Sequence, residues 1–135
     1  MDRRDEFRAE QRLLYGWPIW FTDDATGELM QGQMVDICSE AVAFTYYAHE
    51  ICLFHNQPIT AHFSVPLCGL GDSFAVRDFV RSGYTRRIDS VGKLLHRVTT
   101  QFIEPLPFRP GEQTRNDADM IAMLKMLSSP RVGSA

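Results

Sequence analysis

The sequence predicts a small antiparallel β-barrel or β-sandwich that ends in one short helix. Two observations support this fold class. Short segments rich in β-branched and aromatic residues, several with alternating hydrophobicity, follow one another between residues 17 and 103. A proline-rich stretch and a single helical pattern come after them. The length of 135 residues and the hydrophobic content of 44% fit one domain with its own core.

The predicted strands are bounded by turn residues. The stretch 59–65 alternates most clearly, because its odd positions are apolar and its even positions are polar. Residues 23–27 supply turn residues after the first strand. We expect Trp17 and Phe21, with Trp20, to pack in the core or at the barrel rim. The expected strands are 17–22, 33–37, 42–47, 59–65, 74–80, 83–88 and 97–103, of which 74–80 and 83–88 could form one strand bent near Ser82 and Gly83.

Prolines 105, 107 and 110 are expected to end the sheet, because proline cannot donate to a strand ladder. Asn116 or Asp117 can then cap a helix that runs to about Leu127. The apolar face of this helix is predicted to consist of Met120, Met123, Leu124 and Leu127. The chain therefore divides into a flexible N-terminal arm (1–15), a barrel with its helix (16–127) and a tail (128–135).

Composition excludes several classes of function. The net charge of −3 and the pI of about 5.7 argue against a broad DNA or RNA binder. No apolar run approaches the ~20 residues that span a bilayer, and the charged N-terminus lacks the apolar stretch of a signal peptide. We therefore expect a cytoplasmic protein without a membrane partner. Three cysteines without a CxxC pair, Cys38, Cys52 and Cys68, indicate buried free thiols.

Arg8 and Arg12 form an arginine pair separated by three residues, just before the first predicted strand. A guanidinium group is a planar fork of donors that fits phosphate oxygens or the O6/N7 edge of guanine. Such a pair can clamp an anionic ligand that carries a purine. On spacing alone, a solvated charged segment is the better interpretation, with Glu6 and Glu10 as ion-pair partners.

A second candidate feature is the segment 35–44, which is typical of a strand, a tight turn and another strand. Asp36 could present its carboxylate at the strand end, where it can accept hydrogen bonds from a guanine N1/N2 edge. The alternative is an Asx-type turn, in which Asp36 bonds its own backbone. Taken alone, the turn interpretation is favoured.

Together these features resemble the PilZ domain family. The matching pattern is an Arg-x-x-x-Arg pair, a proline six residues after the second arginine, and an Asp-x-Ser-x-x-Gly turn between two strands. It stands here as Arg8 and Arg12, Pro18, and the turn from Asp36 through Cys38 to Ala41. The later segments 80–86 and 98–102 and the C-terminal helix are similar in order. The resemblance covers roughly residues 8–127.

The resemblance implies a six-stranded barrel with a C-terminal helix that binds the bacterial second messenger cyclic di-GMP. By this resemblance, Arg8 and Arg12 would bind phosphates and guanine edges, Asp36 would accept from a base, and Cys38 and Ala41 would complete the turn. The protein would be a non-enzymatic effector that needs no cofactor and signals to a partner protein not yet identified. Whether the domain forms a homodimer is left open.

Two turn positions depart from the family pattern. A thiol at Cys38 is a weak donor and acceptor, and losing one neutral hydrogen bond costs about 0.5–1.5 kcal/mol. Ser39 should point to the other strand face, if the strand is regular, and cannot substitute. If the position of Ala41 requires a positive φ, its Cβ costs roughly 1–2 kcal/mol, and its methyl group could also obstruct the close approach of a flat base. We therefore expect weakened binding, and the alternative is a degenerate PilZ-like interaction module that binds no nucleotide.

Other sites are less well supported. The sequence contains no catalytic or nucleotide-loop motif such as GxSxG, HExxH or a Walker loop. His49, Cys52 and His55 have ligand types at spacings of three, but a structural zinc site needs a fourth ligand, for which only Glu50 or Cys68 is available. We expect an ordinary loop there. Other basic residues, Arg81, Arg86 and Arg87, are expected on a solvent-facing strand side, with a basic face toward the arm as the alternative.

Overall fold

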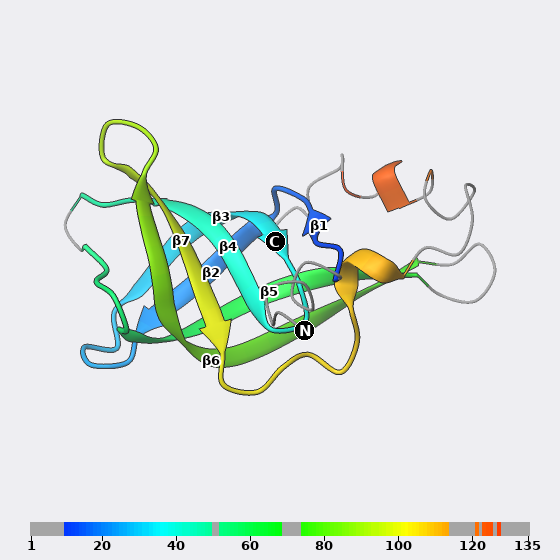
Figure 1. Ribbon diagram of the computed structural model, residues 1–135, viewed down its shortest axis with the longest axis horizontal. Coiled ribbons are helices and arrows are strands. Elements are labelled where there is room, and N and C mark those ends of the chain that lie inside the picture. Colours follow the sequence, from blue (N-terminus) through cyan, green and yellow to red (C-terminus); the bar gives the residue numbers. More distant parts are fainter. Residues whose placement is uncertain are drawn as a thin grey trace, which may run out of the picture.

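The computed structural model describes residues 10–49, 52–68, 74–113, 121, 123–125 and 127, apart from the side chains of 68 and 74. Seven strands and one short 3-10 helix follow the order of the chain (Figure 1). They are β1 (Leu13–Leu14), β2 (Pro18–Asp23), β3 (Leu29–Ile37), β4 (Ala41–Tyr47), β5 (Pro58–Cys68), β6 (Phe74–Ser90), β7 (Leu95–Phe102) and η1 (Pro110–Glu112).

Six of these strands close into an antiparallel barrel. The sheet runs β3-β2-β5-β6-β7-β4, and a further pairing between β4 and β3 joins its ends. Strand β3 can serve both ends because its first half pairs with β2 and its second half with β4. Strand β1 adds to β3 outside the closed ring. The predicted small barrel is therefore confirmed, with one additional short strand at its N-terminal side.

Side-chain alternation fills the barrel with apolar groups. In β5 the odd positions Ile59, Ala61, Phe63 and Val65 are buried, as the sequence pattern predicts. The rings of Phe63 and Phe102 stack with their centroids 5.6 Å apart. Full burial of side chains of this size contributes about 1.5–3 kcal/mol each.

The aromatic residues that open the barrel sequence divide between core and surface. Trp17 and Phe21 lie in the core, as expected. Trp20 is 36% exposed, because β2 points alternate side chains outward, so the expected packing is wrong for this residue.

Strand β6 runs without interruption for 17 residues through the predicted bend. A side chain at Gly83 would overlap the backbone carbonyl of Gln101, so glycine permits the close approach of β7. The β6–β7 register shifts between Thr85 and Arg87, which leaves Arg86 in a bulge. The shift places Arg87 on the outer face of the barrel, although Arg81 shares the inner face with Phe79.

The described part of the predicted N-terminal arm lies against the barrel. Leu13 and Leu14 pair with Ile37 and Asp36 of β3. Leu13 and Tyr15 are buried, and the Tyr15 hydroxyl donates to the backbone oxygen of Ser64 at 2.9 Å. Burial raises the pKa of Tyr15 far above its usual value.

The C-terminal segment is described in part. Residues 121, 123–125 and 127 are helical, Met123 is buried and Leu127 is partly buried. Leu124 is 57% exposed, so the predicted apolar face is wrong at that position. The proposed caps Asn116 and Asp117, together with Met120, lie outside the described residues. Within the described residues, none of the helices has the length and apolar character needed to cross a membrane.

Candidate functional site

Asp36 lies at the centre of a charged cluster on the outer face of the barrel. It is nearly buried near the end of β3, where its two carboxylate oxygens accept hydrogen bonds from two arginines. Arg12 Nη1 lies 3.3 Å from Oδ1, and Arg97 Nη2 lies 3.3 Å from Oδ2. The structure therefore brings Arg12 and Asp36 together, and Asp36 does not form the alternative Asx-type turn. Arg8 lies outside the described residues.

Strand register explains why these side chains meet. Asp36 pairs with Ala43 of β4, Ala43 pairs with Thr99 of β7, and Thr99 pairs with Arg87 of β6. Residues at paired positions point to the same face of a sheet, so these side chains form one row. Asp89, two residues after Arg87 in β6, pairs with Arg97, two residues before Thr99 in β7, and both lie on the same face.

The charged side chains line a pocket of about 270 Å³, which we call the arginine pocket. Arg87 Nε donates to Asp89 Oδ2 at 2.9 Å. The three arginine side chains are 40–75% exposed, although the Asp36 side chain that joins two of them is only 11% exposed. Their donors are therefore within reach of a ligand in solvent. The residues that line the pocket are Arg12, Arg87, Asp89, Arg97 and Thr99.

The turn between β3 and β4 is tight and unstrained. Cys38, Ser39 and Glu40 are the three residues between the strands, and Cys38 N donates to the Ala41 oxygen at 2.9 Å. Ala41 begins β4 opposite Gln101. Among the described non-glycine residues, only Asn56 and Leu94 have a positive φ. The condition for a steric cost at Ala41, a positive φ, is therefore not met.

Cys38 and Ser39 differ in what they offer a ligand. Cys38 is half-buried, and its desolvation raises the pKa of the thiol. Ser39 lies in a bend and not in a regular strand, so the condition under which it was expected to point to the other strand face is not met. Its N–H and its hydroxyl both donate to the carboxylate of Glu10, at 2.6 and 2.8 Å. Glu10 was expected to pair with arginines, and it binds this turn.

Arg97 is a site residue that the sequence did not predict, and for Arg87 the favoured prediction was the solvent-facing side, with a basic face toward the N-terminal arm as the alternative. Arg87 is indeed 75% exposed. The alternation of residues 95–102, with Val98 and Phe102 buried, was the available signal, since it places Arg97 on the outer face. Arg81 is half-buried beside the Phe79 ring and does not line the pocket.

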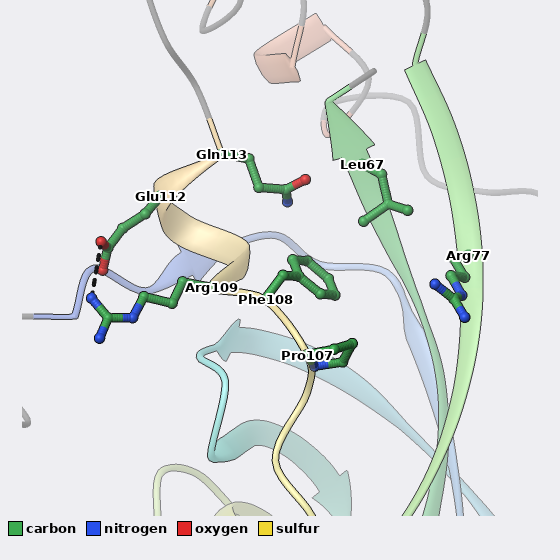
Figure 2. A pocket seen from close by; sticks show the side chains of 7 residues that line it. All are labelled: Leu67, Arg77, Pro107, Phe108, Arg109, Glu112 and Gln113. Carbon is green, nitrogen blue, oxygen red and sulfur yellow. Dashed lines mark hydrogen bonds and ion pairs between the residues drawn. The ribbon is translucent and has the colours of Figure 1, made fainter. Parts of the chain in front are cut away.

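A second pocket, the η1 groove, has about 680 Å³ and a more apolar lining. Phe108 and Leu67 face each other across it (Figure 2). Arg109 Nη1 donates to Glu112 Oε1 at 3.5 Å, and Glu112 Oε2 also accepts from the backbone N–H of Gln11 at 3.0 Å. The η1 groove is lined by Leu67, Arg77, Pro107, Phe108, Arg109, Glu112 and Gln113.

Among the described residues, no group of three metal-binding side chains comes together. Cys52 is exposed, so the predicted burial of its thiol is wrong, and His49 and His55 are exposed too. Glu50 lies outside the described residues, as does the side chain of Cys68. The zinc hypothesis gains no support from the part of the chain that can be examined.

Comparison with known proteins identifies the fold. No family model and no curated protein matches the sequence. The solved structure of the inhibitor of motility MotI/DgrA from Bacillus subtilis is similar, with a TM-score of 0.56 and 13% identity over 90% of this chain and 52% of that one. This chain therefore spans about half the length of MotI. The PilZ domain of CeSA from a cellulose-synthesizing bacterium gives a TM-score of 0.48 and 12% identity, over 87% of this chain and 95% of that one. The similarity to MotI shows that this chain shares the fold of that structure.

Proposed function

We propose that this protein is a non-catalytic receptor for cyclic di-GMP and that the arginine pocket is its binding site. The observation that supports this proposal is the convergence of Arg12, Arg87 and Arg97 on one outer face beside Asp36. Cyclic di-GMP presents two phosphates and two guanine edges. Both are chemical groups that guanidinium forks recognise.

Asp36 has a different role in this proposal from the one the family resemblance implies. Both of its oxygens are engaged by arginines, so it first positions Arg12 and Arg97. Holding the two forks before binding reduces the entropy lost when the ligand arrives. Asp36 can accept a hydrogen bond from a guanine edge only if one of its two arginines moves from the Asp36 carboxylate to a phosphate. Arg8, four residues before Arg12 in the sequence, is proposed to add a further contact.

The two departures in the turn affect affinity unequally. Ala41 has ordinary backbone geometry and carries no strain. Cys38 still lacks a good hydrogen-bond donor, which limits the expected loss to about 0.5–1.5 kcal/mol, or roughly two- to tenfold in Kd. The arginines supply stronger, charge-assisted contacts. We therefore expect binding that is weakened and not lost.

Isothermal titration of the protein with cyclic di-GMP tests the proposal directly. We expect saturable heat with the wild-type protein and loss of that heat in Arg12→Ala. The absence of heat and of chemical-shift changes at millimolar ligand would refute nucleotide binding and leave the alternative of an interaction module. Under our proposal the bound state is read by a partner protein in the bacterial cytoplasm, where this second messenger acts.

A further inference from the structure

The Ser39 turn is an anion-binding group that the chain itself fills. The N–H and the hydroxyl of Ser39 converge on the two oxygens of the Glu10 carboxylate. Two donors directed at one pair of anionic oxygens form the same arrangement that binds a phosphate oxygen. We call Ser39 N–H and Oγ the Ser39 clamp.

The clamp lies next to the arginine pocket along the chain. Glu10 is two residues before Arg12, and Ser39 is three residues after Asp36, which binds Arg12. The Glu10–Ser39 and Arg12–Asp36 contacts therefore hold the same N-terminal segment against the same turn between β3 and β4. An anion that binds Arg12 comes close to the carboxylate that already fills the clamp.

We propose that Glu10 is a built-in competitor of the anionic ligand. Its carboxylate fills the Ser39 clamp in the ligand-free protein, and a phosphate oxygen of the ligand replaces it. The inference rests on the proposed function for the identity of the ligand, cyclic di-GMP. Ser39 thereby adds a hydroxyl donor at its own position in the turn, separate from the position of Cys38.

Displacement of Glu10 is a local event. The rest of the segment has its own attachments: Gln11 N donates to Glu112, and Leu13 and Tyr15 are buried. Losing the clamp contact therefore frees residue 10 without unfolding β1. The affinity for the ligand is reduced by the fraction of molecules in which Glu10 occupies the clamp.

Titration of three proteins with cyclic di-GMP at fixed ionic strength tests this inference. Glu10→Ala should bind roughly tenfold more tightly than wild type, the factor expected for a lost charge-assisted hydrogen bond. Glu10→Gln, which keeps the size of the side chain, should give a smaller gain. Glu28→Ala is the matched control, because it removes an equal charge from the exposed hairpin between β2 and β3 and should leave Kd unchanged. Equal affinity of wild type and Glu10→Ala would overturn the inference, as would an equal gain in Glu28→Ala.

A second readout separates this inference from the proposed function. The Ser39 amide resonance of Glu10→Ala should shift on titration with inorganic phosphate, whereas that of wild type should not. If phosphate shifts Ser39 but no protein binds cyclic di-GMP, the proposed function fails and the clamp stands. If the Ser39 resonance does not respond in Glu10→Ala, the clamp is refuted whatever the dinucleotide does.

Discussion

The arginine pocket and the η1 groove differ in the way their arginines are held. In the smaller arginine pocket, Arg12 and Arg97 share the nearly buried Asp36, and their remaining surface faces solvent. In the larger η1 groove, Arg109 pairs with Glu112, and Arg77 lies over the Phe79 ring. Arginines held side by side by one carboxylate can contact one multivalent anion together, whereas Arg77 and Arg109 each have a different partner. The smaller pocket is therefore the better candidate for a phosphate ligand.

Arginine substitutions should give the largest difference between the arginine pocket and the η1 groove, measured as the change in ligand affinity. Arg97→Ala removes one of the two forks that Asp36 holds, and we expect cyclic di-GMP binding to weaken by about a hundredfold, as for a lost bidentate charge-assisted contact. Arg77→Ala, at the η1 groove, should change Kd less than twofold. Calorimetric titration of both variants measures this difference. Comparable losses in the two variants would show that the ligand does not distinguish the regions.

Carboxylate substitutions should give the next largest difference, in stability. Asp36→Asn leaves two adjacent guanidinium groups without their shared counter-charge, and we expect the free energy of unfolding to fall by about 1–2 kcal/mol, with solvent exposure of the arginines limiting the loss. Glu112→Gln breaks a more exposed pair and should cost less than about 1 kcal/mol. Urea denaturation at neutral pH measures both changes. A larger loss in Glu112→Gln would reverse the ranking of the two regions.

The effects of Cys38 and Ala41, the two unusual residues of the turn, on ligand affinity can be measured separately. Cys38→Ser restores a hydroxyl and should tighten ligand binding by up to about tenfold. Ala41→Gly should not tighten it, because Ala41 has ordinary backbone geometry in β4. Calorimetry of the single variants separates the two effects. Tighter binding by Ala41→Gly would mean that its methyl group obstructs the ligand.

The smallest difference should be the one between the alkylation rates of Cys38 and Cys52. Burial raises the pKa of Cys38, so less of it is thiolate near neutral pH than for an ordinary thiol, and its reaction with iodoacetamide should rise only at higher pH. Exposed Cys52 should be alkylated several times faster at pH 7.5. Peptide mass spectrometry of a time course assigns the two rates. Faster labelling of Cys38 would indicate that its turn opens readily in solution.

Local sequence patterns predicted the strands well and the site only in part. Alternation in 59–65 depends on neighbouring residues, so the buried face of β5 could be predicted. The contact of Asp36 with Arg97 joins residues 61 positions apart and depends on the pairing of β4 with β7. No local pattern encodes that pairing. The binding of Glu10 to Ser39 was missed for a related reason, since a charged residue between arginines suggests an ion pair before it suggests a backbone contact.

The two oxygens of Glu112 join the regions compared above. One accepts from the N–H of Gln11, and the other accepts from Arg109 at the wall of the η1 groove. Movement of residue 11 away from η1 would therefore remove one of the two hydrogen bonds that Glu112 accepts and weaken its pairing with Arg109. Events at the leading segment are in this way mechanically linked to the shape of a surface that the arginine pocket does not touch.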